Sequence, residues 1–335
     1  MFTSIEKVRE LIAGKAPVIV AGDEALLRSL PKGNWIGGTI PYFMTPEGGR
    51  TSRTHAFVTE VPKLARSVRI EVYDEHTISR IGVDSPENGY TILILPAFSG
   101  LHRMFALEAP GFENLFMKVV AGWIAGTHLD DVGKITAKVF AGPAGEMTDS
   151  QGVAMHVELP REYQAKIGIV NIFEQGDGVD IQFPTTGFEA SECIVDGKRY
   201  SVRDYMGPAP FDLRLPLVAN YNGTKCNVAF RSIDIPGSKL AFFAPVFEGV
   251  TYRQAKPVED YAQRFMTAIP QDIGPTVFCC NCVHNYLYGE LEGRRTGSLQ
   301  GPMTFGEIAY QLLNRTLVHV TLSKRKQRIA VSLNG

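Results

Sequence analysis

The sequence predicts an α+β fold with mixed or mostly antiparallel sheets and flanking helices. Glycine and proline occupy 33 and 20 of the 335 positions, and this frequency of turns suits short strands. Runs typical of strands outnumber helical patterns and do not alternate regularly with them, which argues against a doubly wound parallel sheet. A third observation is that Trp35–Thr39 (WIGGT) is echoed by Trp123–Thr127 (WIAGT). This echo predicts two similar units in tandem.

The first 61 residues show both kinds of element. Apolar residues at helical spacing predict a helix over Ile5–Ala13, and the continuous apolar run Pro17–Ala21 predicts a buried strand. A short helix is expected over Asp23–Ser29. The strand Asn34–Thr39 then leads into a glycine turn, and we expect His55–Val61 to complete a hairpin with it.

Strands dominate the central part of the chain, apart from one helical stretch over Phe105–Ala121 that is broken near Gly111. Asp196-Gly197 between two strand-like runs is typical of a two-residue hairpin turn. Alternating or continuous apolar runs predict strands over Val68–Tyr73, Thr91–Leu95, Val153–Leu159, Lys166–Phe173, Glu192–Val195, Cys226–Ser232 and Lys239–Val246.

The last quarter carries four expected elements. A helix is predicted over Val258–Ala268 and a buried strand over Thr276–Val283. Phe305–Leu313 is expected to form a helix or an extended turn, and Leu317–Leu322 a closing strand.

Composition excludes several classes of protein. The chain is 44% hydrophobic with a net charge of -1, so it is neither disordered nor a general binder of nucleic acid or anionic membranes. The longest apolar stretches, such as Thr91–Phe98, are too short to span a membrane, and the amino terminus lacks the order of a signal peptide. Five cysteines do not make a disulfide framework. We therefore expect a cytoplasmic protein with reduced thiols.

Familiar enzyme motifs are missing from the sequence. Gly33, Gly37 and Gly38 have the wrong spacing for a dinucleotide fingerprint or a P-loop, and Phe98-Ser99-Gly100 lacks the first glycine of a nucleophile elbow.

The cluster Cys279-Cys280-Asn281-Cys282-Val283-His284 is the sharpest chemical feature. On one strand, Cys280, Cys282 and His284 would share a face, because side chains alternate. This pattern leaves open a metal site formed by the three, haem b bound by His284, and a hydrolase or transferase that uses the Cys282 thiol with His284. The plain alternative is that the thiols are small apolar core residues.

Motifs along most of the chain resemble the FIST family of sensory domains. The terminal motif Thr304–Ala309 (TFGEIA), followed by Asn314-Arg315-Thr316 and an apolar strand, is similar to the family's carboxy-terminal signature. Trp35–Thr39 resembles its first glycine turn. Asn285 stands where the family usually has an arginine, and the amino-terminal half is shortened, so the chain resembles a divergent stand-alone member.

The resemblance implies an amino-terminal FIST-like domain over residues 1–198 and a carboxy-terminal one over residues 199–335. It implies a cytoplasmic, non-enzymatic signal-input protein that binds a small molecule such as an amino acid or related metabolite. Some family members are haem-based sensors that modulate histidine kinases. A stand-alone sensor needs a separate signalling partner, such as a histidine kinase, and neither nucleic acid nor membrane is expected as a partner.

We expect the ligand site near the closing motif. Glu307 lies in an apolar setting and needs a partner if buried, and Gly306 permits close approach of a ligand. An alternative is that Glu307 only ties two loops together and Asn314 caps a turn. The expected walls are Asn285, Tyr286, Gly306, Glu307 and Asn314 on one side, and Gly37, Gly38 and Thr39 on the other.

Overall fold

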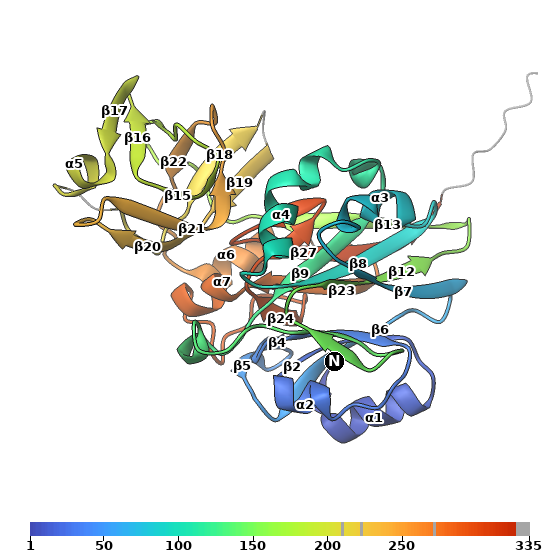
Figure 1. Cartoon of the computed structure of the whole chain (residues 1–335). Coiled ribbons are helices and arrows are strands. Elements are labelled where there is room, and N and C mark those ends of the chain that lie inside the picture. Colours follow the sequence, from blue (N-terminus) through green and yellow to red (C-terminus); the bar gives the residue numbers. More distant parts are fainter. Residues whose placement is uncertain (209–210, 222–223, 271–272, 326–335) are drawn as a thin grey trace, which may run out of the picture.

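The computed structural model describes residues 1–208, 211–221, 224–270 and 273–325. Within these ranges it contains seven α-helices and five sheets, most of whose strand pairs are antiparallel, so the predicted α+β class is confirmed. Three of the sheets share one large core, and the other two form a module at one side of it (Figure 1).

The first sheet comes from the amino-terminal third, apart from two strands. Its strand order is β1-β6-β2-β3-β10-β11. Helices α1 (Ile5–Ala13) and α2 (Glu24–Arg28) cover one face, where Val8, Ile12 and Leu27 are buried. The strands are β1 (Phe2–Ser4), β2 (Val18–Gly22), β3 (Trp35–Thr39), β6 (His55–Glu60), β10 (Val139–Ala141) and β11 (Glu146–Thr148).

The second sheet has the order β26-β25-β9-β8-β12-β7. Short helices follow β7 and β8: α3 (Ile81–Asp84), α4 (Gly100–Glu108), and the 3-10 turns η1 (Ile78–Arg80), η2 (Ala109–Gly111) and η3 (Leu115–Met117). The strands are β7 (Ser67–Tyr73), β8 (Gly89–Pro96), β9 (Val120–Ala125), β12 (Gly152–Glu158), β25 (Glu307–Ala309) and β26 (Gln311–Leu313). A further turn, η4 (Leu129–Asp131), follows β9.

The third sheet has the order β13-β27-β23-β24-β4-β5 and joins both ends of the chain. Helices α6 (Tyr261–Ala268) and α7 (Val283–Tyr288) flank β23 in the sequence. The strands are β4 (Tyr42–Thr45), β5 (Gly48–Thr51), β13 (Tyr163–Val170), β23 (Thr276–Cys282), β24 (Gly301–Thr304) and β27 (Leu317–Lys324).

Strands β14 to β22 form what we call the inserted module, residues 181–254. The chain leaves the third sheet after β13 and returns to it at β23, and the module has its own apolar core around Phe183, Phe242 and Tyr252. It stands to one side of the three sheets, away from α1 and α2 (Figure 1). Its elements are β14 (Ile181–Gln182), β15 (Gly187–Ala190), β16 (Glu192–Val195), β17 (Lys198–Ser201), α5 (Val202–Met206), β18 (Leu217–Tyr221), β19 (Thr224–Val228), β20 (Phe230–Asp234), β21 (Lys239–Val246) and β22 (Tyr252–Gln254).

Two details of the predicted connections differ from the structure. β3 pairs with β2 in parallel and with β10, so the expected hairpin between Asn34–Thr39 and His55–Val61 is wrong. The hairpin in this region is β4–β5 instead. Phe305–Leu313 forms the short strands β25 and β26, which agrees with an extended turn and excludes the alternative of a helix.

The expected domain boundary after residue 198 falls inside β17, in the hairpin that Asp196 and Gly197 close with positive φ. The repeated pentapeptide begins at Trp35 on β3 and Trp123 on β9. Each of these strands pairs in parallel with the strand before it, β2 or β8. The hairpin turn is confirmed, and the tandem origin of the two units stays a prediction.

Across the described part of the chain, none of the helices has the length and apolar character needed to cross a bilayer.

Candidate functional site

The cysteine-rich strand ends earlier than the sequence predicts. β23 stops at Cys282 and α7 starts at Val283, so His284 lies on a helix and not on the strand face of Cys280 and Cys282. The described residues contain no group of three or more histidine, cysteine, aspartate or glutamate side chains that could hold a metal ion. The alternative metal site of Cys280, Cys282 and His284 is therefore not assembled, because the chain turns away after the strand.

Burial works against the alternative of a thiol nucleophile. Burial and the nearby Glu307 raise the pKa of the Cys282 thiol well above its ordinary value. Burial and the positive charge of Arg315 lower the pKa of His284 to about 3. Both groups are neutral at pH 7, whereas the nucleophile in such a pair is the thiolate. The arrangement opposes the charge separation that this chemistry requires.

The surroundings of His284 do not fit haem b. Its ring lies 4.5 Å from the ring of Phe243 in the inserted module and 5.7 Å from that of Tyr288, centroid to centroid. A haem ligated by His284 would need the space that these rings fill. His284 instead joins α7 to the module by aromatic packing.

Glu307 is the most unusual acid in the described residues. Its side chain on β25 is completely buried, and its Oε2 accepts hydrogen bonds from the backbone N–H and the hydroxyl of Thr316, at 3.1 and 2.8 Å. Burial raises the pKa of Glu307 to about 8 despite these donors, so the carboxyl is mostly protonated at neutral pH. Its other oxygen has no hydrogen-bond partner in the described structure.

Arg315 adjoins this acid in sequence and is almost completely buried. Its Nη2 donates to the hydroxyl of Tyr261 at 2.7 Å and to the backbone carbonyl of Arg214 at 2.9 Å. The guanidinium carbon also lies 4.8 Å from the ring centre of Phe173 and 5.0 Å from that of Tyr288. Among the described residues no carboxylate forms an ion pair with it, and aromatic rings and backbone carbonyls surround the charge.

Arg315 holds the connections of the inserted module to the core. Phe173 precedes the module, Arg214 lies within its range and Tyr261 follows it on α6. One side chain therefore contacts the entry, a loop and the exit of the module. Its backbone has φ 60°, a left-handed conformation that an arginine adopts only when its surroundings compensate.

Several buried amides surround the same corner. Asn285 donates to Asn281 Oδ1 at 2.9 Å, and the backbone N–H of Cys282 donates to the same oxygen at 2.7 Å. Asn314 donates from its own amide to the backbone carbonyl of Leu313. Within the part of the chain that the structure describes, the buried side-chain atoms without a hydrogen-bond partner include Asn281 Nδ2, Asn285 Oδ1, Glu307 Oε1, Asn314 Oδ1 and Arg315 Nε.

The two expected walls do not face each other across an open space. A Cβ on Gly306 would lie 3.0 Å from side-chain atoms of Ile124 and Leu312, so this corner is closed by apolar groups. The buried indole of Trp123, the register partner of Glu307, would lie 3.1 Å from a Cβ on Gly38. Trp123 thus fills space next to both walls.

The remaining predicted site residues have local roles. Thr39 Oγ1 accepts from the backbone N–H of Lys138 at 2.9 Å. Gly37 packs against the carbonyl of Val20. The Tyr286 hydroxyl contacts Thr51 and donates to Glu292.

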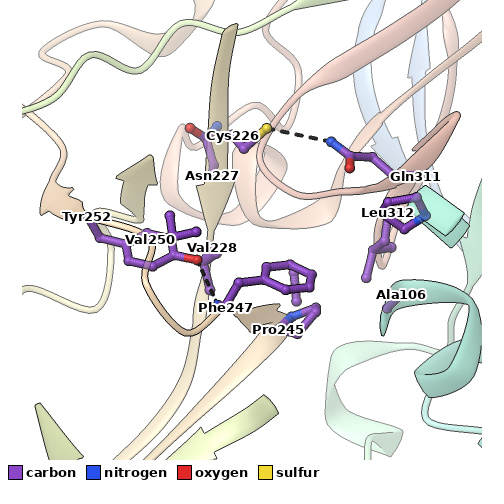
Figure 2. Close-up of a pocket in the computed structure, with 12 residues that line it drawn as sticks. Ala106, Cys226, Asn227, Val228, Pro245, Phe247, Val250, Tyr252, Gln311 and Leu312 are labelled. Carbon is purple, nitrogen blue, oxygen red and sulfur yellow. Dashed lines mark hydrogen bonds between the residues drawn. The ribbon is translucent and has the colours of Figure 1, made fainter. Parts of the chain in front are cut away.

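A pocket of about 510 Å³ opens between the inserted module and the second sheet (Figure 2). Strands β19 and β21 and the loop after β21 form one wall, and α4, η2 and β26 form the other. The volume lies within the range of about 300–1,000 Å³ that is typical of small-molecule sites. The lining residues are Ala106, Pro110, Cys226, Asn227, Val228, Ala244, Pro245, Phe247, Val250, Tyr252, Gln311 and Leu312.

Hydrogen bonds connect this pocket, which we call the junction pocket, to the predicted ligand site. Asn227 on its wall donates to the backbone carbonyl of Asn314 at 3.2 Å, one residue before Arg315. Asn227 also exchanges two side-chain hydrogen bonds with Asn171, at 3.0 and 3.1 Å. Gln311 on the opposite wall points its amide nitrogen toward the sulfur of Cys226, 3.6 Å away (Figure 2).

A family model described as a family of unknown function, DUF6976, matches residues 3–323, nearly the whole chain. The chain belongs to this family. A comparison of the chain with curated proteins found no match. The resemblance to FIST domains stays a prediction.

Sequence reasoning placed Asn314, Glu307 and Asn285 in the candidate site but missed Asn227 and Gln311. Cys226–Ser232 is correctly expected to include a strand, β19, but nothing local signals that this strand faces another module. Gln311 lies in a short hairpin between two apolar residues, and only the register of β25 and β26 brings it to the pocket. Both residues acquire their position from long-range packing.

Proposed function

We propose that this DUF6976 chain is a small-molecule-binding sensory protein of the cytoplasm, without enzymatic activity, that acts through a separate signalling partner such as a histidine kinase. The observation that carries the proposal is the apolar pocket at the junction of the inserted module and the core. Ligand pockets in proteins are mostly apolar, have a few convergent polar groups and occur preferentially between domains.

Placement of the pocket supports a sensory role. An occupant would contact both walls and so bias the position of the module relative to the core, which is how a ligand shifts a population of two arrangements. The hydrogen bond from Asn227 to Asn314 lies between the pocket and Arg315, whose side chain holds the connections of the module. A change in the position of Asn227 at the pocket would therefore act, through Asn314, on the Arg315 contacts that hold the module to the core.

Native mass spectrometry of freshly purified protein tests the proposal. We expect the wild-type chain to carry a co-purified small molecule that is absent from a variant with Ala244, on the pocket wall, replaced by Phe. The control is the same substitution at the exposed Ala144, which does not line the pocket. A bound molecule retained equally by both variants would place the ligand elsewhere.

A further inference from the structure

None of the described residues that line the junction pocket is charged. Its polar members are Cys226, Asn227, Tyr252 and Gln311, and the other eight are apolar. We infer that the pocket selects an uncharged, mainly apolar molecule of medium size with one hydrogen-bonding group, such as a hydroxyl, at the end near Gln311. This inference rests on the proposed function and differs from the resemblance to FIST domains, which implies an amino acid or related metabolite as the ligand.

The polar groups of the pocket determine which end group fits. Both N–H groups of the Asn227 amide are already used, on Asn171 and on the carbonyl of Asn314. The Tyr252 hydroxyl accepts from the backbone N–H of Phe247 at 2.9 Å. Among the described residues, the one hydrogen bond of the Gln311 side chain is the long contact from its nitrogen to the Cys226 sulfur, so its side-chain oxygen is the acceptor best placed for a ligand. An acceptor of this kind favours a hydroxyl or an amide N–H.

Charge excludes the amino acids from this pocket. A carboxylate or ammonium moved there would lose its hydration and find no opposite charge among the lining residues. The chain does offer a charged alternative, a cleft of about 430 Å³ lined by Arg66, Arg69 and Arg161 together with Asp84 and Glu158. A zwitterionic ligand would fit that cleft and not the junction pocket.

The experiment uses the neutral fluorescent probe N-phenyl-1-naphthylamine with the full chain. We expect the probe to bind, 1-octanol to displace it, and octanoate and L-leucine to compete at least about tenfold more weakly at pH 7.5. Ala244→Phe is expected to weaken probe binding by about tenfold or more, while Ala144→Phe leaves it unchanged. Gln311→Leu is expected to weaken 1-octanol about fivefold, the loss of one neutral hydrogen bond, and to spare the probe.

Thiol labelling of the wild-type chain gives a second readout, which does not require the Ala244→Phe variant to fold. Cys226 is the half-buried cysteine and lines the pocket. Saturating 1-octanol is expected to slow its reaction with methyl methanethiosulfonate at pH 8.5.

Three outcomes overturn the inference. If octanoate or L-leucine competes as well as 1-octanol and Ala244→Phe abolishes that competition, the pocket is still a ligand site, and only the ligand class is wrong. If the probe binds equally to wild type and Ala244→Phe, or if 1-octanol leaves Cys226 labelling unchanged, the pocket does not hold such molecules. The proposed function is tested separately, by whether native mass spectrometry detects a small molecule that co-purifies with the wild-type chain.

Discussion

Asn227 on the pocket wall donates a hydrogen bond of 3.2 Å to the backbone carbonyl of Asn314 in the closing motif. Asn227 belongs to the inserted module and Asn314 to the core, and both are buried. The bond therefore joins the junction pocket to the corner that holds Glu307 and Arg315.

Replacing Asn227 with Asp keeps the shape of the side chain but removes both N–H donors. The carbonyl of Asn314 and the oxygen of Asn171 would lose their donor, and a carboxylate would be buried. We expect the free energy of unfolding to fall by about 1–3 kcal/mol, measured by urea denaturation. The control is the same substitution at the exposed Asn114, and an equal effect at the two positions would contradict the buried bond.

Glu307→Gln should make stability less dependent on pH. The folded chain holds the Glu307 proton up to a pKa of about 8, whereas the unfolded chain releases it near 4.5. Wild-type stability is therefore lost as the pH rises from 4.5 through 8, by up to about 5 kcal/mol at 1.36 kcal/mol per pKa unit. Glutamine keeps an acceptor for Thr316 and carries no charge.

Urea denaturation at pH 5 and pH 8.5 measures this effect. We expect the glutamine variant to be more stable than wild type at pH 8.5 and close to it at pH 5. A difference of the same size at both pH values would show that Glu307 is ionised throughout.

His156 should give the opposite pH dependence. It is buried on β12, where Nδ1 lies 2.8 Å from the Thr91 hydroxyl and Nε2 lies 3.1 Å from that of Tyr73. Burial, with Arg69 nearby, lowers its pKa to about 4 from 6.5. As the pH falls, His156 therefore binds a proton in the unfolded chain before it does so in the folded chain. Its contribution to the free energy of unfolding is complete above pH 6.5 and is lost toward pH 4, by up to about 3 kcal/mol.

Comparison of wild type with His156→Gln tests this sign. The stability advantage of wild type at pH 7.5 should shrink steadily as the pH is lowered to 4.5, as followed by urea denaturation. If this stability advantage stays constant between pH 7.5 and 4.5, then His156 has the same pKa in the folded and the unfolded chain, which would contradict the prediction.

Arg315→Lys should destabilise the attachment of the inserted module. Lysine keeps the charge but lacks the second nitrogen, Nη1, that reaches the His284 carbonyl while Nη2 bonds the Tyr261 hydroxyl and the Arg214 carbonyl. It also lacks the planar guanidinium that lies against the rings of Phe173 and Tyr288. We expect the free energy of unfolding to fall by about 2–4 kcal/mol. Hydrogen exchange should show faster opening of residues 211–221. Arg264→Lys, on the exposed side of α6, is the matched control, and equal effects of the two substitutions would contradict the role of Arg315.

The sequence predicted the elements well and their long-range relations poorly. The helix Ile5–Ala13 and the Asp196-Gly197 turn follow from local spacing and turn chemistry, and both are present. The partner of β3 depends on a parallel crossover that local pattern does not encode. His284 was misplaced for a related reason, because the strand signal of the cysteine run continues past the point where the chain turns into α7.

The candidate site was predicted in part. The sequence indicated that Glu307 would need a partner if buried, and left open whether this partner is a ligand or an internal donor; in the structure Thr316 is an internal donor to it. The pocket itself lies between segments more than 80 residues apart in the chain, such as Cys226 and Gln311, and no local pattern brings them together. Its position is a property of the packing of the module on the core.

A crystal structure of the chain as purified tests the central claim most directly. We predict electron density for a bound molecule between α4, β19 and β26, in contact with Gln311 and without a charged group in the pocket. A junction pocket filled by the protein's own side chains or by ordered water alone, with a ligand bound at another place, would contradict the account.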